Sequence, residues 1–133
     1  MDFGVKDKVA VVTGASEGLG KAIALVLGQE GARVAITARR SEQLDSAASE
    51  IRDQTGADVL AVTGDMSAKA NVETFIGAVV DKWDTVHVLV NNVGRAMRGK
   101  FADLSQDEWR NALDANLFSA IYCTELALPL MRR

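Results

Sequence analysis

Cysteine, histidine, proline and tyrosine each occur only once in this sequence of 133 residues. The single Cys123 excludes a disulfide within the chain and suits a reducing compartment. His87 has neither a cysteine nor a second histidine to join it, so we expect no metal site. No segment approaches the ~20 apolar residues of a membrane-spanning helix. The first residues also lack the apolar core of a signal peptide, and we therefore expect a cytoplasmic protein.

A large excess of one charge is absent as well. Lysine and arginine number 15 against 18 aspartate and glutamate residues, which leaves a net charge of −3. Such a balance gives no reason to expect nucleic acid or an anionic membrane as a partner. The chain is long enough to bury the core of one domain.

What the sequence does contain is an alternation of short apolar runs with helical periodicity. The runs cover residues 9–12, 34–37, 59–62 and 86–90. Each is apolar nearly throughout, as in strands that are covered on both faces of a parallel sheet. Two of the intervening segments place apolar residues at the spacing of a one-sided helix, namely Leu44, Ala47, Ala48 and Ile51, and then Val72, Phe75, Ile76, Val79, Val80 and Trp83. The pattern predicts an α/β fold with a doubly wound parallel sheet.

Helix ends are also marked in the sequence. Gly31 and Gly56 fall where the first two helices should stop. Ser41 and Ser105 are expected N-caps, and Glu108 stands at the capping-box spacing from Ser105. We further expect tryptophan side chains to anchor two of the helices against the sheet, at Trp83 and Trp109.

A glycine-rich turn follows the first apolar run, with the sequence Thr13-Gly14-Ala15-Ser16-Glu17-Gly18-Leu19-Gly20. It joins a predicted strand to a predicted helix. Glycines let a diphosphate approach the backbone, and the free N–H groups and positive dipole end of the helix attract its charge. The turn therefore indicates a phosphate site, although a plain strand-to-helix turn rich in glycine is the alternative.

Several motifs together resemble those of the short-chain dehydrogenase/reductase family. The glycines are spaced Gly-x3-Gly-x-Gly, and Asn91-Asn92-Val93-Gly94 follows the fourth apolar run. Asp65, Asn116 and Pro129-Leu130-Met131 also match, so the resemblance covers essentially the whole chain. Val93 departs from it, because the family usually has alanine there. The resemblance implies that residues 1–133 form a Rossmann-like dinucleotide-binding domain with strand order 3-2-1-4.

The same resemblance implies roles for the residues of the glycine turn. Gly14 would form the turn itself. Gly18 and Gly20 would allow the diphosphate to approach, and Leu19 would offer its backbone N–H.

Further cofactor contacts are implied after the third and fourth strands. Asp65, beside Met66, would accept a hydrogen bond from the adenine amino group, or else serve as a turn carboxylate before Ser67. Asn91 and Gly94 would line the adenine ribose and hold neighbouring strands. A purely structural role for Asn91 is the alternative.

The end of the second strand favours NADP over NAD as the cofactor. The strand ends in Arg39 and Arg40 with no acid at its tip, and a guanidinium group can pair with the 2′-phosphate. Ser16 would add a hydroxyl contact. Glu17 argues against this choice, because many NADP-preferring relatives carry a basic residue there. Surface arginines ahead of a helix are the alternative.

The proton-transfer residues that the resemblance implies are missing. The family uses a serine and Tyr-x3-Lys, whereas Tyr122 is followed by Leu126 four residues later. Asn116 would be the one catalytic residue present, holding a water of the proton relay. Its alternative is to kink or cap its own helix. We therefore expect an N-terminal half, truncated before the fifth strand and inactive by itself.

Two functions remain open from the sequence. The intact protein would be an NADP-dependent oxidoreductase that acts on a small carbonyl or alcohol substrate; some relatives with similar motifs reduce 3-oxoacyl thioesters. Alternatively, the chain is a non-catalytic dinucleotide-binding or interaction module. Because residues 117–131 are apolar nearly all round, and the family pairs this helix with its symmetry mate, we also expect a homodimer or homotetramer.

Overall fold

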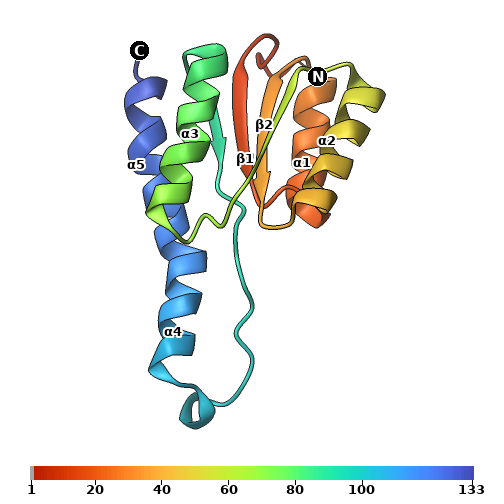
Figure 1. The fold of residues 1–133 in the computed structure, drawn as a ribbon. Coiled ribbons are helices and arrows are strands. Elements are labelled where there is room, and N and C mark those ends of the chain that lie inside the picture. Colours follow the sequence, from red (N-terminus) through yellow and green to blue (C-terminus); the bar gives the residue numbers. More distant parts are fainter. Residues whose placement is uncertain (1) are drawn as a thin grey trace.

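The computed structural model describes residues 2–133 as a parallel sheet between two layers of helices (Figure 1). Its four strands are β1 (Val9–Thr13), β2 (Arg33–Ala38), β3 (Val59–Thr63) and β4 (Val88–Val90). They pair in the order β3-β2-β1-β4. The doubly wound fold and the strand order predicted from the sequence are both confirmed.

Helices alternate with these strands along the chain. They are α1 (Gly18–Gln29), α2 (Ser41–Thr55), α3 (Lys69–Trp83), α4 (Gln106–Leu113) and α5 (Ser119–Met131). A π-helical segment (Asp114–Phe118) joins α4 to α5, and a single 3-10 turn (Phe101–Asp103) precedes α4. None of the described helices has the length and apolar character to cross a membrane.

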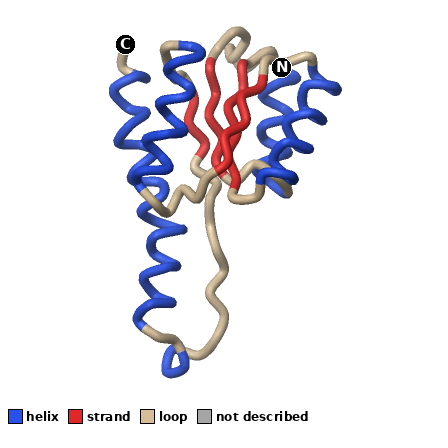
Figure 2. The backbone as a smooth tube through the Cα atoms, in the orientation of Figure 1, coloured by secondary structure: helices blue, strands red, loops and turns tan. Residues whose placement is uncertain are grey.

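Strand β1 is buried on both sides, which explains why it is apolar throughout. Ala10 and Val12 pack into the core under α1 and α2. Val9 and Val11 pack into the opposite core, under α3 and α5. Figure 2 shows the helices on the two sides of the strands.

Two of the expected boundaries are wrong. β4 begins at Val88 rather than at residue 86. His87, just before it, bonds to Val9 twice: its backbone N–H donates to the Val9 carbonyl oxygen at 2.9 Å, and its Nδ1 accepts from the Val9 N–H at 2.9 Å. Ser41 is the first helical residue of α2 and not its N-cap, a position that Arg40 occupies without a side-chain hydrogen bond. The capping box of Ser105 and Glu108 is confirmed.

The loop after β4 and helix α4 extend away from the sheet (Figures 1 and 2). We call residues 96–113 the arm. Trp109 lies on the arm, where its ring contacts Phe101 with the ring centroids 5.7 Å apart. It therefore does not anchor a helix against the sheet as expected, whereas Trp83 does pack against the core between α3 and the sheet.

Candidate active site

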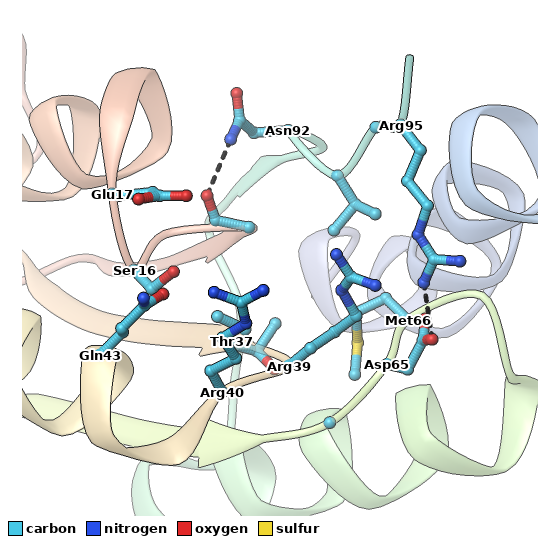
Figure 3. Close-up of a pocket in the computed structure, with 15 residues that line it drawn as sticks. Ser16, Glu17, Thr37, Arg39, Arg40, Gln43, Asp65, Met66, Asn92 and Arg95 are labelled. Carbon is cyan, nitrogen blue, oxygen red and sulfur yellow. Dashed lines mark hydrogen bonds and ion pairs between the residues drawn. The ribbon is translucent and has the colours of Figure 1, made fainter. Parts of the chain in front are cut away.

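A cavity of about 280 Å³ opens at the carboxyl ends of the strands (Figure 3). Its walls come from the segments that follow β1, β2, β3 and β4. In doubly wound sheets ligands bind at this edge, where the strand order reverses, and here the reversal lies between β1 and β4. The cavity brings together seven of the residues proposed from the sequence, namely Gly14, Ser16, Arg39, Arg40, Asp65, Met66 and Gly94.

The remaining proposed residues do not line this cavity. Gly18, Leu19 and Gly20 form the first turn of α1, next to Glu17 on the cavity wall. The Leu19 side chain is exposed and does not line the cavity. Asn91 and Asn116 are exposed and are not among the residues that line the cavity.

The first turn of α1 offers unpaired donors next to the cavity. The N–H groups of Gly18, Leu19 and Gly20 have no acceptor within their own helix, because the first turn of any helix lacks one. Glu17 occupies the N-cap position and makes no side-chain capping bond. The helix dipole adds positive potential at this end, so the turn can hold an anion.

The glycines of the turn are required for different reasons. Gly18 has a φ of 58°, and an added Cβ would meet no atom within 4 Å, so its backbone conformation alone favours glycine. A Cβ at Gly20 would instead collide with the carbonyl oxygen of Gly14 and lie 2.5 Å from Asn92 Nδ2. The requirement at Gly20 is therefore close packing within the chain, a reason that the sequence did not reveal.

Asn92, rather than Asn91, ties the ends of β1 and β4 together. Its backbone N–H donates to Thr13 Oγ1 at 3.0 Å, and its Nδ2 donates to the carbonyl oxygen of Gly14 at 3.0 Å. Asn91 points the other way and donates to Thr124 Oγ1 of α5 at 3.2 Å. The strand-holding role predicted for Asn91 thus belongs to its neighbour, because successive side chains of an extended chain point to opposite sides.

Arg39 and Arg40 supply positive charge to the cavity. Both are exposed at the end of β2 and line the cavity, where Figure 3 shows one guanidinium group on the side of Ser16 and the other on the side of Met66. Among the described residues neither takes part in an ion pair. Their guanidinium groups can therefore receive an anionic ligand, while Glu17 places a negative charge on the same wall.

Asp65 is held by three hydrogen bonds. Its Oδ1 accepts from the backbone N–H of Ser67 at 3.0 Å and from Ser67 Oγ at 2.7 Å, and its Oδ2 pairs with Arg95 Nη2 at 2.7 Å. Partial burial raises the pKa of this carboxyl, but the bonds from Ser67 and the bond and charge of Arg95 outweigh it and hold the pKa below its usual value. The turn role considered for Asp65 is therefore present, and Asp65 is charged at neutral pH.

Asn116 fixes the main chain of the loop after β4. Its Nδ2 donates to the carbonyl oxygen of Arg95 at 2.9 Å, and its Oδ1 accepts from the Arg95 N–H at 3.1 Å. Nδ2 also donates to the carbonyl oxygen of Ala112 at 2.9 Å, and Asn116 lies in the π segment. Such segments inside helices are frequent at functional sites. The pairing of Arg95 with Asp65 was not proposed from the sequence, which gives no signal for a partner thirty residues away.

Cys123 is not a candidate for a reactive thiol. It lies on the buried side of α5, and burial raises the pKa of its thiol to about 11.

Comparison with known proteins extends these observations. The family model of the short chain dehydrogenases matches residues 8–133. An uncharacterised oxidoreductase of Staphylococcus epidermidis is 33% identical over 127 residues, which are 96% of this chain and 54% of the relative.

Two solved structures with bound dinucleotides share the fold. The L-sorbose reductase of Gluconobacter frateurii, complexed with NADPH and L-sorbose, has a TM-score of 0.97 at 30% identity over 99% of this chain and 50% of its own. An alcohol dehydrogenase of Thermococcus sibiricus, complexed with 5-hydroxy-NADP, has a TM-score of 0.92 at 32% identity over 96% of this chain and 55% of its own. The chain thus spans about half the length of these relatives. With this fold, this cavity and these motifs, the chain belongs to the short-chain dehydrogenase family.

Proposed function

We propose that the natural-length protein is a cytoplasmic NADP-dependent oxidoreductase that transfers hydride between the nicotinamide and a small carbonyl or alcohol substrate. Membership of an oxidoreductase family supports the reaction class. The pair of arginines at the end of β2, which face the cavity without an ion-pair partner among the described residues, is the observation that carries the choice of cofactor. The NADPH and 5-hydroxy-NADP bound by the two similar structures agree with it.

The donors and acceptors around the cavity fit the parts of an NADP molecule. Arg39 and Arg40, with Ser16, would hold the 2′-phosphate, since guanidinium groups pair strongly with phosphate oxygens. The first turn of α1 would receive the diphosphate. Asp65, next to the buried Met66, would accept a hydrogen bond from the adenine amino group. Gly94 would lie against a ribose.

The nicotinamide supplies the hydride when the cofactor is bound. The residues of this chain would bind and orient it. Asn116 would act on the reaction through the loop that it fixes. The serine and Tyr-x3-Lys that transfer the proton in the family are not among these 133 residues, and we place them elsewhere in the natural-length protein.

Assembly is a further part of the proposal. α5 buries one side against α3 and the sheet through residues such as Cys123 and Ala127. Its other side and the π segment expose large apolar residues, namely Leu117, Phe118, Ile121, Leu128 and Met131. We therefore propose that this surface pairs with a second copy in a homodimer or homotetramer.

Arg39→Ala tests the choice of cofactor. A hydrogen bond to a charged group contributes about 1.5–3 kcal/mol, which corresponds to roughly 10–150-fold in affinity. The substitution should weaken NADPH binding to the natural-length protein by about this factor and leave NADH binding nearly unchanged, as measured by titrating nicotinamide fluorescence. Arg33→Ala removes the same charge at the far end of β2 and should change neither. An equal loss for NADH and NADPH would contradict a role of Arg39 in reading the phosphate.

A further inference from the structure

The ion pair between Asp65 and Arg95 joins the two outermost loops of the candidate site. Asp65 follows β3 and Arg95 follows β4, which are the two edge strands of the described sheet. Both side chains line the cavity, and Figure 3 shows the Arg95 guanidinium pointing at the carboxylate. The pair measures 2.7 Å between Nη2 and Oδ2. It therefore sets where the Asp65 carboxylate stands in the cavity wall.

The main chain of Arg95 is held in turn by the side chain of Asn116. Asn116 accepts from the N–H of Arg95 and donates to its carbonyl oxygen, so the main chain of Arg95 is fixed on both sides of its Cα. Gly94 allows this approach, because a Cβ there would lie 2.8 Å from Asn116 Oδ1. The π segment, Arg95 and Asp65 thus form one continuous series of contacts that ends in the cavity.

Most of the hydrogen-bond acceptor positions of the Asp65 carboxylate are already occupied. An ionised carboxylate offers about four acceptor positions. Oδ1 receives two donors from Ser67, and Oδ2 receives one from Arg95. About one position remains, on Oδ2, and the three bonds prevent the carboxylate from turning to suit another ligand. Such a group accepts one further N–H donor and repels a carbonyl oxygen in the same place.

We propose that Arg95 is a positioning residue that makes the cavity select a base with an exocyclic amino group. This inference rests on the proposed function, in which Asp65 faces the adenine ring. Adenine presents an amino group to Oδ2. Hypoxanthine presents an oxo group at the same position and leaves the carboxylate unpaired, which is the kind of mismatch that binding sites reject strongly. Without Arg95, the two bonds from Ser67 still hold the turn, but Oδ2 is free to be solvated.

The experiment compares NADPH with its hypoxanthine analogue on the natural-length protein, by titrating nicotinamide fluorescence. We expect the wild-type protein to bind NADPH about 10–150-fold more tightly than the analogue, as for a hydrogen bond to a charged group. Arg95→Met should reduce this ratio by about fivefold or more, and Asp65→Asn should remove most of it. Arg98→Met removes the same charge from an exposed position of the same loop and should keep the wild-type ratio.

Each other outcome has a definite meaning. If wild-type protein binds neither nucleotide, the proposed function fails. If it binds both with equal affinity, the inference and the proposed contact of Asp65 with adenine fail, while the NADP-dependent reaction stands. If Arg95→Met weakens both by the same factor, the inference alone fails. Arg95→Lys keeps a cation that can donate to Oδ2 and should give a ratio between those of wild type and Arg95→Met. It also provides the comparison if the methionine variant does not fold, and a lysine variant with no preference for NADPH would then contradict the inference.

Discussion

Individual glycines determine how closely α1 approaches the ends of β1 and β4. Gly20 lies against the carbonyl group of Gly14 and the amide group of Asn92. Both neighbours belong to the network that joins the two strands. A side chain at position 20 would therefore disturb the wall of the candidate site as well as the packing of the helix.

Gly20→Ala should lower the free energy of unfolding of the natural-length protein by about 1–3 kcal/mol, the usual cost of overpacking. Gly77→Ala is the matched control, because Gly77 lies in α3, is exposed and has no atom within 4 Å of an added Cβ. Alanine there should stabilise by about 0.5–1 kcal/mol through its higher helix propensity. Denaturant unfolding of both variants provides the measurement. Equal stabilities would show that α1 can move away without cost.

Asn116→Ala should lower turnover more than cofactor affinity. Asn116 holds the Arg95 main chain from the π segment and does not line the cavity. Releasing that loop would misplace reacting groups, and a misplacement of about 1 Å can cost on the order of 100-fold in rate. Steady-state kinetics and NADPH titration of the natural-length protein separate the two effects. A loss confined to NADPH affinity would make Asn116 a structural residue of the cofactor site alone.

Many of the residues that line the cavity were predictable from local motifs, but the hydrogen bonds and the ion pair between them were not. Gly14, Arg39 and Asp65 line it because glycine turns and strand ends meet at one edge of a parallel sheet. Asn92 rather than Asn91 holds the end of β1 because its side chain points toward β1, whereas that of Asn91 points toward α5. The pairing of Arg95 with Asp65 depends on loop geometry between distant strands, which leaves no pattern in the sequence.

At the scale of elements, the arm differs from the rest of the molecule. α1, α2, α3 and α5 each pack against the sheet, whereas α4 extends away from it (Figure 1). Its own stabilising features are therefore local ones, of which the capping box of Ser105 and Glu108 is the clearest. Trp109 was expected against the sheet because a tryptophan usually anchors a helix, but its partner Phe101 belongs to the arm.

Ser105→Ala should loosen α4 without affecting the sheet. The serine accepts the N–H of Glu108 at 3.1 Å, and loss of an N-cap costs about 1 kcal/mol. Amide hydrogen exchange in the natural-length protein should accelerate by about fivefold in residues 106–113, with β1 unchanged. Unchanged exchange in α4 would mean that tertiary packing, and not the cap, holds this helix.

For the molecule as a whole, the 133-residue chain by itself should not be a stable monomer. Among the described strands β4 pairs on one side only, with β1, and its residues are apolar. An open apolar edge favours pairing with another chain. The apolar residues exposed on α5 form a second surface that favours association with another chain. We expect light scattering over a dilution series to detect dimers or larger species. A monodisperse monomer at micromolar concentration with cooperative unfolding would contradict this expectation.

A crystal structure of the natural-length protein with NADPH tests the central claim most directly. We expect the 2′-phosphate within hydrogen-bonding distance of Arg39, the diphosphate at the first turn of α1, and the adenine amino group at Asp65 Oδ2 with the bond to Arg95 intact. Nucleotide bound elsewhere, or bound in the cavity with its 2′-phosphate away from both Arg39 and Arg40, would contradict the account.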